Sequence, residues 1–147
     1  MSRMTITRLI NAPIDFVFDT VANISEFSQA IPHIVKVEFL TDQQSGVGTR
    51  FRETRLMKGK EATTELEVTE YVENEQIRLV ADSHGSIWDT VFNVESDDGQ
   101  TELTMTMDAK PYTLMQKLMI PMIMGMITKA VEKDMDAVKE FCEKTVS

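Results

Sequence analysis

Short dipeptides that end in glycine divide the middle of the sequence into segments of strand length. They are Lys58-Gly59, His84-Gly85 and Asp98-Gly99. Two-residue hairpin loops favour such dipeptides because their backbone takes positive φ values, which glycine adopts without strain. Asn74-Glu75 is a weaker candidate for the same role. Because a two-residue loop fixes which residues face each other, these four turns predict the whole register of an antiparallel meander.

The predicted register separates the side chains into a polar face and a mainly apolar face. On the polar face of the first hairpin the opposed pairs are favourable ones: Arg50–Glu67, Arg52–Glu65 and Thr54–Thr63. The other face should cover the core, and the residues predicted on it are Phe51, Glu53, Arg55, Met57, Lys60, Ala62, Thr64, Leu66, Glu70, Ile77, Leu79, Ala81, Trp88, Thr90, Phe92, Val94, Leu103, Met105 and Met107. The agreement of four independent turns on one apolar face is the strongest indication of fold in the sequence.

Helical patterns precede the meander. A strand over Met4–Ile10 is followed by Pro13, which suits the first turn of a helix expected to end at about Ala22. Ser25 is a candidate N-cap for a second short helix that should end at about Ala30, before the next proline.

The C-terminal part of the chain predicts one long amphipathic helix from about Pro111 to Lys144. Pro121 is expected to kink this helix or to mark its true start. Its apolar positions follow helical spacing, and the methionines among them include Met115, Met119, Met122 and Met126. A helix and a sheet that each have one apolar face are expected to pack together. The predicted fold is therefore α+β, with a curved antiparallel sheet wrapped around a long C-terminal helix, in a single domain over residues 1–147.

The charge balance narrows the classes of partner. The chain has 24 acidic and 15 basic residues, a net charge of −9, which argues against nucleic acid and equally against docking on an anionic membrane surface. The longest apolar run, Leu118–Ile127, is far shorter than the roughly 20 residues that span a bilayer, so no membrane insertion is expected. Cys142 is the single cysteine and is expected to be a packing residue. Without a disulfide or a signal-peptide pattern, the expected location is cytoplasmic.

Short motifs follow one another in a set order along the chain: Ala12-Pro13, Val17-Phe18, Asn23, Phe27, Pro32, Ile34, the run Gly46–Phe51, and Pro121 in the final helix. In this order they resemble the START and birch-pollen-allergen superfamily (SRPBCC), in particular its bacterial polyketide cyclase/dehydrase-like members. The chain departs from the pattern at Asn23 and Phe27, where many relatives have aspartate and tryptophan. The resemblance implies a helix-grip fold with a hydrophobic cavity between sheet and long helix. The superfamily includes lipid and sterol carriers, polyketide aromatase/cyclases and ubiquinone-binding proteins.

The candidate site consists of the residues that would line such a cavity. Glu53 and Arg55 are both predicted to face inward, where a charge is costly unless it is paired. They either form a structural pair near the cavity mouth or lie in a hydrated cavity and orient a polar group of a ligand. The methionines either fill the core or line an adaptable pocket. The full predicted set is Phe51, Glu53, Arg55, Leu66, Leu79, Trp88, Thr90, Phe92, Met105, Met107, Met115, Met119, Met122 and Met126.

No metal or cofactor site is predicted. The two histidines, His33 and His84, are expected in loops, and neither has a second histidine or a cysteine at ligand spacing. The sequence also contains no phosphate-binding loop and no nucleophile elbow.

Three functions remain open at this point. The first is the binding of a small hydrophobic or amphipathic molecule, such as a lipid, a quinone or an aromatic polyketide. The second is an aromatase/cyclase-type enzyme, in which Glu53 or Arg55 assists proton transfer or polarises a carbonyl. The third is a protein-interaction module, because Ile120 and Met124 leave the main apolar stripe. These two residues either pack on the second short helix or form an exposed patch that joins two copies in a homodimer.

Overall fold

The computed structural model describes residues 2–146, which form a seven-stranded antiparallel sheet and three helices. The helices are α1 (Ile14–Ala22), α2 (Ile24–Ala30) and α3 (Leu114–Val146). The strands are β1 (Ser2–Ile10), β2 (Ile34–Phe39), β3 (Arg50–Met57), β4 (Lys60–Val72), β5 (Gln76–Ser83), β6 (Ser86–Asp97) and β7 (Gln100–Pro111). They are ordered β1-β7-β6-β5-β4-β3-β2, so β1 and β2 are the two edges of the sheet.

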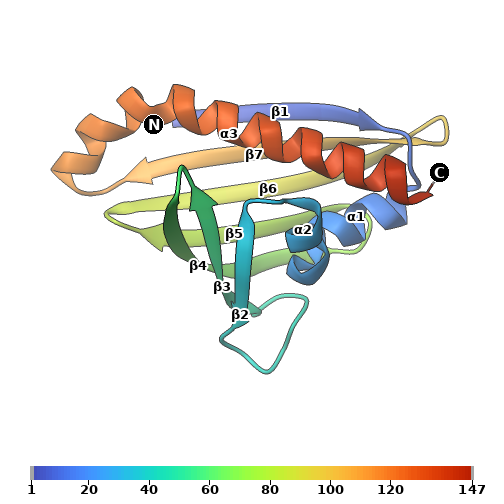
Figure 1. The fold of residues 1–147 in the computed structure, drawn as a ribbon, viewed down its shortest axis with the longest axis horizontal. Coiled ribbons are helices and arrows are strands. Elements are labelled where there is room, and N and C mark those ends of the chain that lie inside the picture. The colour runs from blue at the N-terminus through green and yellow to red at the C-terminus, as the bar shows by residue number, and fades with distance from the viewer. Residues whose placement is uncertain (1, 147) are drawn as a thin grey trace.

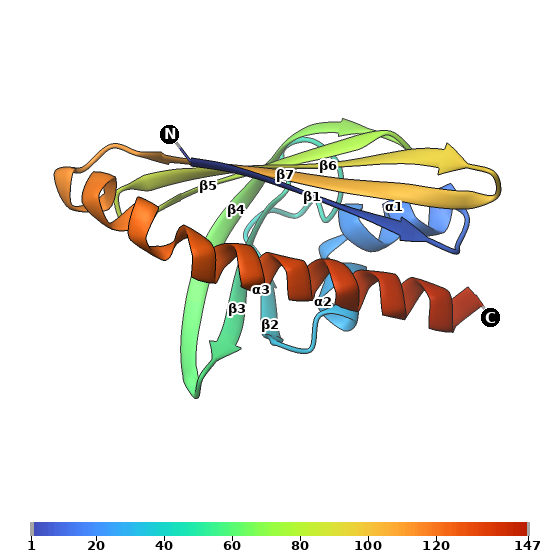
Figure 2. The same cartoon turned by 90° about the horizontal axis from the view of Figure 1, so that it is seen from above.

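The sheet and α3 form two layers, and the short helices close one end. Figure 2 shows the sheet on one side of α3, with β2, β3 and β4 curling past the helix. Figure 1 shows α1 and α2 at the end of the molecule where α3 terminates. This arrangement confirms the α+β, helix-grip architecture expected from the two apolar faces.

Three of the four predicted turns are confirmed. Lys58-Gly59, His84-Gly85 and Asp98-Gly99 are two-residue loops in which both residues have positive φ. The predicted cross-strand partners follow from them, for example Arg52 opposite Glu65 and Phe92 opposite Met105.

The prediction of a two-residue loop at the fourth turn, Asn74-Glu75, is wrong. Val72 pairs with Gln76, so three residues connect β4 to β5. A β-bulge between Val68 and Glu70 adds one residue to β4 and restores the alternation, so that Val68 and Leu79 face each other on the concave side. The bulge also turns Glu70 outward, where it accepts a hydrogen bond from Arg78 at 2.6 Å. The predicted inward position of Glu70 is therefore wrong.

Two helix boundaries differ from the prediction. Asn23, not Ser25, is the N-cap of α2, because its side-chain oxygen accepts a hydrogen bond from the Ser25 amide at 3.0 Å. Helix α3 begins at Leu114 because Pro111 still belongs to β7. Pro121 lies inside the helix and does not mark its start.

The turn between β5 and β6 anchors the beginning of α3. The amides of Tyr112 and Thr113 donate to the carbonyl of Gly85 at 2.9 and 3.3 Å. Gly85 has a φ of 93°, and a Cβ at this position would lie 2.6 Å from Thr113 Oγ1. A side chain at residue 85 would therefore be strained by the positive φ and would collide with the side chain of Thr113. The hydrogen bonds to Gly85 hold the start of α3 at this turn.

Candidate functional site

A cavity of about 430 Å³ lies between the concave face of the sheet and α3. Its size is within the range of about 300–1,000 Å³ typical of small-molecule sites. Strands β3 to β7 provide one wall, α3 provides the opposite wall, and α1 and α2 close the end. The residues that surround it include Val21, Ala22, Ile24, Phe27, Thr49, Val68, Ala81, Val131, Met135 and Val138.

The walls are mainly apolar because alternate residues of each strand point to the concave face. Phe51, Leu79 and Phe92 are all buried there. The ring of Phe92 contacts that of Phe27 in α2 edge to face, with 6.0 Å between the centroids. This contact joins the sheet to the short helices, so a pair of aromatic rings packs at the closed end of the cavity.

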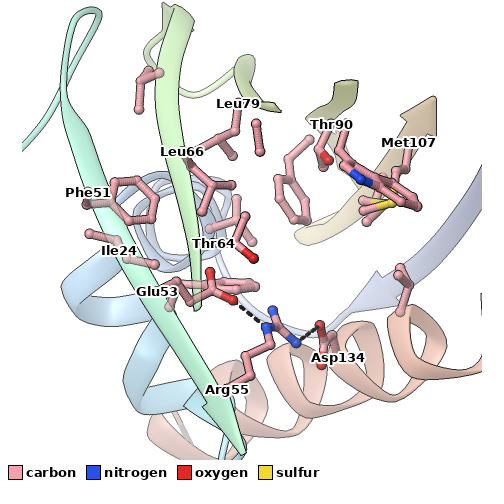
Figure 3. Close-up of a pocket in the computed structure, with 18 of the residues that line it drawn as sticks. Ile24, Phe51, Glu53, Arg55, Thr64, Leu66, Leu79, Thr90, Met107 and Asp134 are labelled. Atoms are coloured by element: carbon pink, nitrogen blue, oxygen red, sulfur yellow. Dashed lines mark hydrogen bonds and ion pairs between the residues drawn. The ribbon is translucent and has the colours of Figure 1, made fainter. Parts of the chain in front are cut away.

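A cluster of three charged residues lies in the wall between β3 and α3, as Figure 3 shows. Arg55 donates a hydrogen bond from Nε to Glu53 Oε1. A second bond runs from Arg55 Nη1 to Asp134 Oδ2 at 2.8 Å. The side chains of Glu53 and Asp134 are only 10% and 15% exposed, and that of Arg55 is 25% exposed. The guanidinium is therefore bound from both sides, by the sheet and by the helix.

The two carboxylates keep Arg55 charged. Burial by itself lowers the pKa of the guanidinium, but the charges of Glu53 and Asp134 and the hydrogen bonds to them outweigh burial and hold that pKa above its ordinary value. Among the residues around the cavity only these three carry charge, so the cluster has a formal charge of −1. An apolar cavity with one ionic cluster can fix the orientation of an otherwise apolar guest.

Unused hydrogen-bonding groups accompany this cluster. Neither bond made by Arg55 uses Nη2, which leaves two N–H groups on that nitrogen. The hydroxyls of Thr64 and Thr90 also border the cavity, and neither has a hydrogen-bond partner among residues 2–146. The site therefore offers several donors to an oxygen atom of a guest molecule.

The structure brings eleven of the predicted site residues together around the cavity. They are Phe51, Glu53, Arg55, Leu66, Leu79, Trp88, Thr90, Phe92, Met105, Met107 and Met126. Glu53 and Arg55 lie at the cavity as a hydrogen-bonded pair. A structural pair and a pair that orients a ligand both require this arrangement.

Three predicted site residues do not reach the cavity. Met115, Met119 and Met122 are 68%, 40% and 83% exposed on the outer side of α3. The reason is the rotation of the helix: Ile120, expected off the main stripe, is 1% exposed and faces inward. Met124 likewise packs against the core. The prediction of an exposed interaction surface built on Ile120 and Met124 is therefore wrong.

Asp134 is the main site residue that sequence reasoning missed. It lies three residues after Val131 and four before Val138, on the buried stripe of α3. An acidic residue at such a position was the signal available in the sequence, because a buried carboxylate requires a partner.

The fold has counterparts among known proteins. The model of a family described as "Polyketide cyclase / dehydrase and lipid transport" matches residues 1–143. No curated protein matches the chain in sequence.

Several solved structures share the fold at low sequence identity. TTHA0849 from Thermus thermophilus is 15% identical and has a TM-score of 0.80, with 99% of this chain and 100% of that chain covered. A START superfamily protein from Mycobacterium smegmatis is 17% identical, has a TM-score of 0.72 and covers 94% and 97% of the two chains. The di-domain ARO/CYC BexL from the BE-7585A biosynthetic pathway is 17% identical with a TM-score of 0.77, and the match covers 97% of this chain and 49% of that one.

Proposed function

Because the chain belongs to the polyketide cyclase/dehydrase and lipid transport family, we propose that it binds a small, uncharged and mainly apolar molecule in the cavity between the sheet and α3. The bound molecule carries at least one oxygen atom that accepts hydrogen bonds. The observation that carries this proposal is the apolar cavity of about 430 Å³ with a single ionic cluster in its wall.

The apolar walls supply the affinity in this proposal. Burial of apolar surface contributes about 25 cal/mol per Å². A guest that replaces water against Leu79, Phe92 and Met105 therefore gains free energy without any specific contact. The methionines add side chains that adapt to an irregular outline.

The ionic cluster supplies the selectivity. Arg55 is already neutralised by Glu53 and Asp134, and the cluster as a whole is formally negative. A carboxylate guest would add a third negative group to this partly buried site, where like charges repel more strongly than in water. A ketone, ester or phenol can accept a hydrogen bond from Arg55 Nη2 without that cost. Neutral guests should therefore bind better than anionic guests of equal length.

The uncharged fluorophore N-phenyl-1-naphthylamine provides a direct test. Its fluorescence should rise when it enters the cavity. 2-Undecanone should then displace it at a concentration at least tenfold lower than undecanoate, since the two competitors share a chain length and differ in charge. Absence of any fluorescence change at micromolar protein would refute the binding proposal.

Asp134→Asn separates selectivity from affinity. This variant removes one negative charge from the cluster and keeps the shape of the side chain. The preference for the ketone over the carboxylate should become smaller, while the affinity of the fluorophore stays within about twofold. An unchanged preference would show that the cluster does not select the guest.

A cyclase is the second candidate function, and the same cluster favours it. Arg55 can polarise a ketone oxygen and the adjacent Glu53 carboxylate can accept a proton, which are the two roles that closure of a poly-ketone requires. Turnover of a model poly-β-ketone that disappears in Glu53→Gln, with fluorophore binding retained, would support the enzyme. Unchanged product distribution with and without the protein would exclude it for that substrate.

A further inference from the structure

Six large apolar side chains form an exposed face on the first part of α3. This methionine face consists of Leu114, Met115, Leu118, Met119, Met122 and Met126, whose exposed fractions run from 40% for Met119 to 83% for Met122. At 3.6 residues per turn they lie within an arc of about 140°. Isolated apolar residues are normal on a protein surface, but a contiguous apolar face marks an interaction site.

The helix that carries this face contacts the rest of the protein on its other side. Ile120 is the one buried residue among 114–130, and Met124 and Ile127 are partly buried against the core. Further along the helix Met135 and Val138 are 1% and 0% exposed. The first turn is anchored to the carbonyl of Gly85 by the Thr113 amide. The methionine face is therefore not the result of a detached helix. It is the outer side of a helix whose inner side completes the core.

The net charge of −9 argues against an anionic surface as a partner of the chain as a whole, but the segment that carries the methionine face differs in charge from the rest. Residues 109–131 contain three lysines and no acidic residue, whereas the remainder has 12 basic and 24 acidic residues. Lys117 and Lys129 are exposed, and neither forms an ion pair within residues 2–146. Lys129 follows Met126 by three residues and so continues the same face. Asp82, whose carboxylate accepts a hydrogen bond from the Tyr112 hydroxyl at 2.7 Å, is an acidic group beside the start of the helix. Acidic groups farther away are screened beyond about 10 Å at 0.1 M salt, so the local charge decides what approaches the rest of this surface.

Apolar side chains bordered by unpaired lysines complement an anionic phospholipid surface. The apolar groups fit the acyl boundary, and each lysine near the surface contributes to attraction by anionic headgroups. A second copy of the chain fits less well, because two such faces would bring Lys117 and Lys129 of both copies together, and residues 109–131 contain no acidic residue to meet them.

The same helix does not fit a membrane-spanning role. By length and composition Leu114–Thr145 is apolar enough to cross a bilayer, with a mean hydropathy of 1.3 in its most apolar 18-residue window, of which 11% is buried. Its second half, however, carries Glu132, Asp134 and Asp136 and packs against the sheet. The helix is instead suited to lie parallel to the membrane surface, while its inner side remains packed on the rest of the protein.

We propose that the methionine face of α3 docks the protein on anionic phospholipid membranes. The face is continuous with the cavity, because Met126 both borders the cavity and is 56% exposed. Met57, at the tip of the β3–β4 hairpin, borders the cavity and is 45% exposed. An apolar guest can therefore pass between bilayer and cavity along apolar side chains. This exchange role depends on the proposed binding function, whereas docking does not.

Flotation with vesicles of phosphatidylcholine alone or with 30% phosphatidylglycerol tests the docking. The protein should float with the phosphatidylglycerol vesicles at 50 mM salt and should remain in solution with phosphatidylcholine alone. Lys117→Gln combined with Lys129→Gln should weaken the binding about 25-fold, at about fivefold for each lysine. Met122→Glu should abolish flotation.

Val47→Glu is the matched control for Met122→Glu. Val47 is also a large exposed apolar residue, at 57%, but it lies in the β2–β3 connection away from α3. This variant introduces the same charge and should float like the unchanged protein. Circular dichroism and N-phenyl-1-naphthylamine binding should be the same in both variants, which separates a lost surface from a lost fold.

Several outcomes would overturn the docking proposal. They are no flotation with phosphatidylglycerol vesicles, equal flotation with phosphatidylcholine alone, and flotation that survives Met122→Glu. A dimer in solution that Met122→Glu dissociates, without flotation of the unchanged protein, would assign the face to a second copy instead. Fluorophore binding without flotation would leave the proposed function intact, and flotation without fluorophore binding would leave docking intact.

Discussion

Arg55 in β3 and Asp134 in α3 are joined by a hydrogen bond of 2.8 Å from Nη1 to Oδ2, which ties the sheet to the helix across the cavity wall. The two residues are 79 positions apart in the sequence. Glu53 binds the same guanidinium from the sheet side. The cluster thus holds the sheet and α3 together. It also places polar groups at the cavity.

Arg55→Met should destabilise the fold by removing the cation from this cluster. Two carboxylates that are 10% and 15% exposed would then have no positive partner. The free energy of unfolding should fall by about 3 kcal/mol, at the low end for broken buried ion pairs because Arg55 is partly exposed. Urea denaturation measures this change. The triple variant with Glu53→Gln and Asp134→Asn should recover most of it, and a triple variant as unstable as Arg55→Met would contradict the explanation.

Ala130→Trp should block the cavity. Ala130 borders the cavity from α3, so the larger side chain occupies space that the guest would use. The affinity for N-phenyl-1-naphthylamine should fall at least tenfold. Glu132→Trp, on the exposed side of the same helix, is the control and should bind normally. Equal affinities in the two variants would place the fluorophore elsewhere.

Trp88 should report on occupancy without any label. It is the single tryptophan of the chain and borders the cavity. An apolar guest displaces water from the indole, so its emission should shift to shorter wavelength and become less sensitive to quenching by iodide. Titration with 2-undecanone checks this. An unchanged emission spectrum at a ketone concentration that fully displaces N-phenyl-1-naphthylamine would mean that the guest does not reach Trp88.

The Cys142 thiol should be unreactive in the native protein. It is fully buried and donates to Thr20 Oγ1 at 3.5 Å. Burial raises the pKa of the thiol, which outweighs the opposite effect of this hydrogen bond, so little thiolate forms near neutral pH. Reaction with Ellman's reagent at pH 8 should be at least 100-fold slower than in 6 M guanidinium chloride. Fast labelling under native conditions would show that the C-terminal part of α3 opens readily.

Acid should weaken the fold partly through Asp89. The hydrogen bond from Arg78, 2.8 Å from Nε to Oδ1, holds the pKa of this carboxyl below its ordinary value of about 4. A lowered folded-state pKa gives stability that is complete above the unfolded-state pKa and is lost as the pH falls through the folded-state value. The free energy of unfolding should therefore decline below about pH 4.

Asp89→Asn is the variant that tests this origin. It should be less stable than the unchanged protein at pH 7, by about 1–3 kcal/mol for a charged hydrogen bond. Its stability should also change less between pH 5 and pH 3, as measured by urea denaturation. An acid dependence identical to that of the unchanged protein would assign the effect to other carboxyls.

Hairpin register was predictable where the turn residues specify it locally. Lys58-Gly59, His84-Gly85 and Asp98-Gly99 each place glycine at the second loop position, and all three pairings followed. Asn74-Glu75 lacks that glycine, and the connection there has three residues. The compensating bulge before Glu70 could not be foreseen, because it depends on how β4 meets β5 rather than on β4 alone.

The sequence by itself determined the sheet, its register in three hairpins, and most of the cavity wall, because strand alternation and turn geometry act between neighbouring residues. It did not determine the rotation of α3, since residues 118–127 are apolar on nearly every side and so define no single inner face. Only the tertiary structure decided it, through the anchor at Gly85 and the inward packing of Ile120. The pairing of Arg55 with Asp134 was decided in the same way, because many acidic residues could have met that arginine and the packing of helix on sheet selects one.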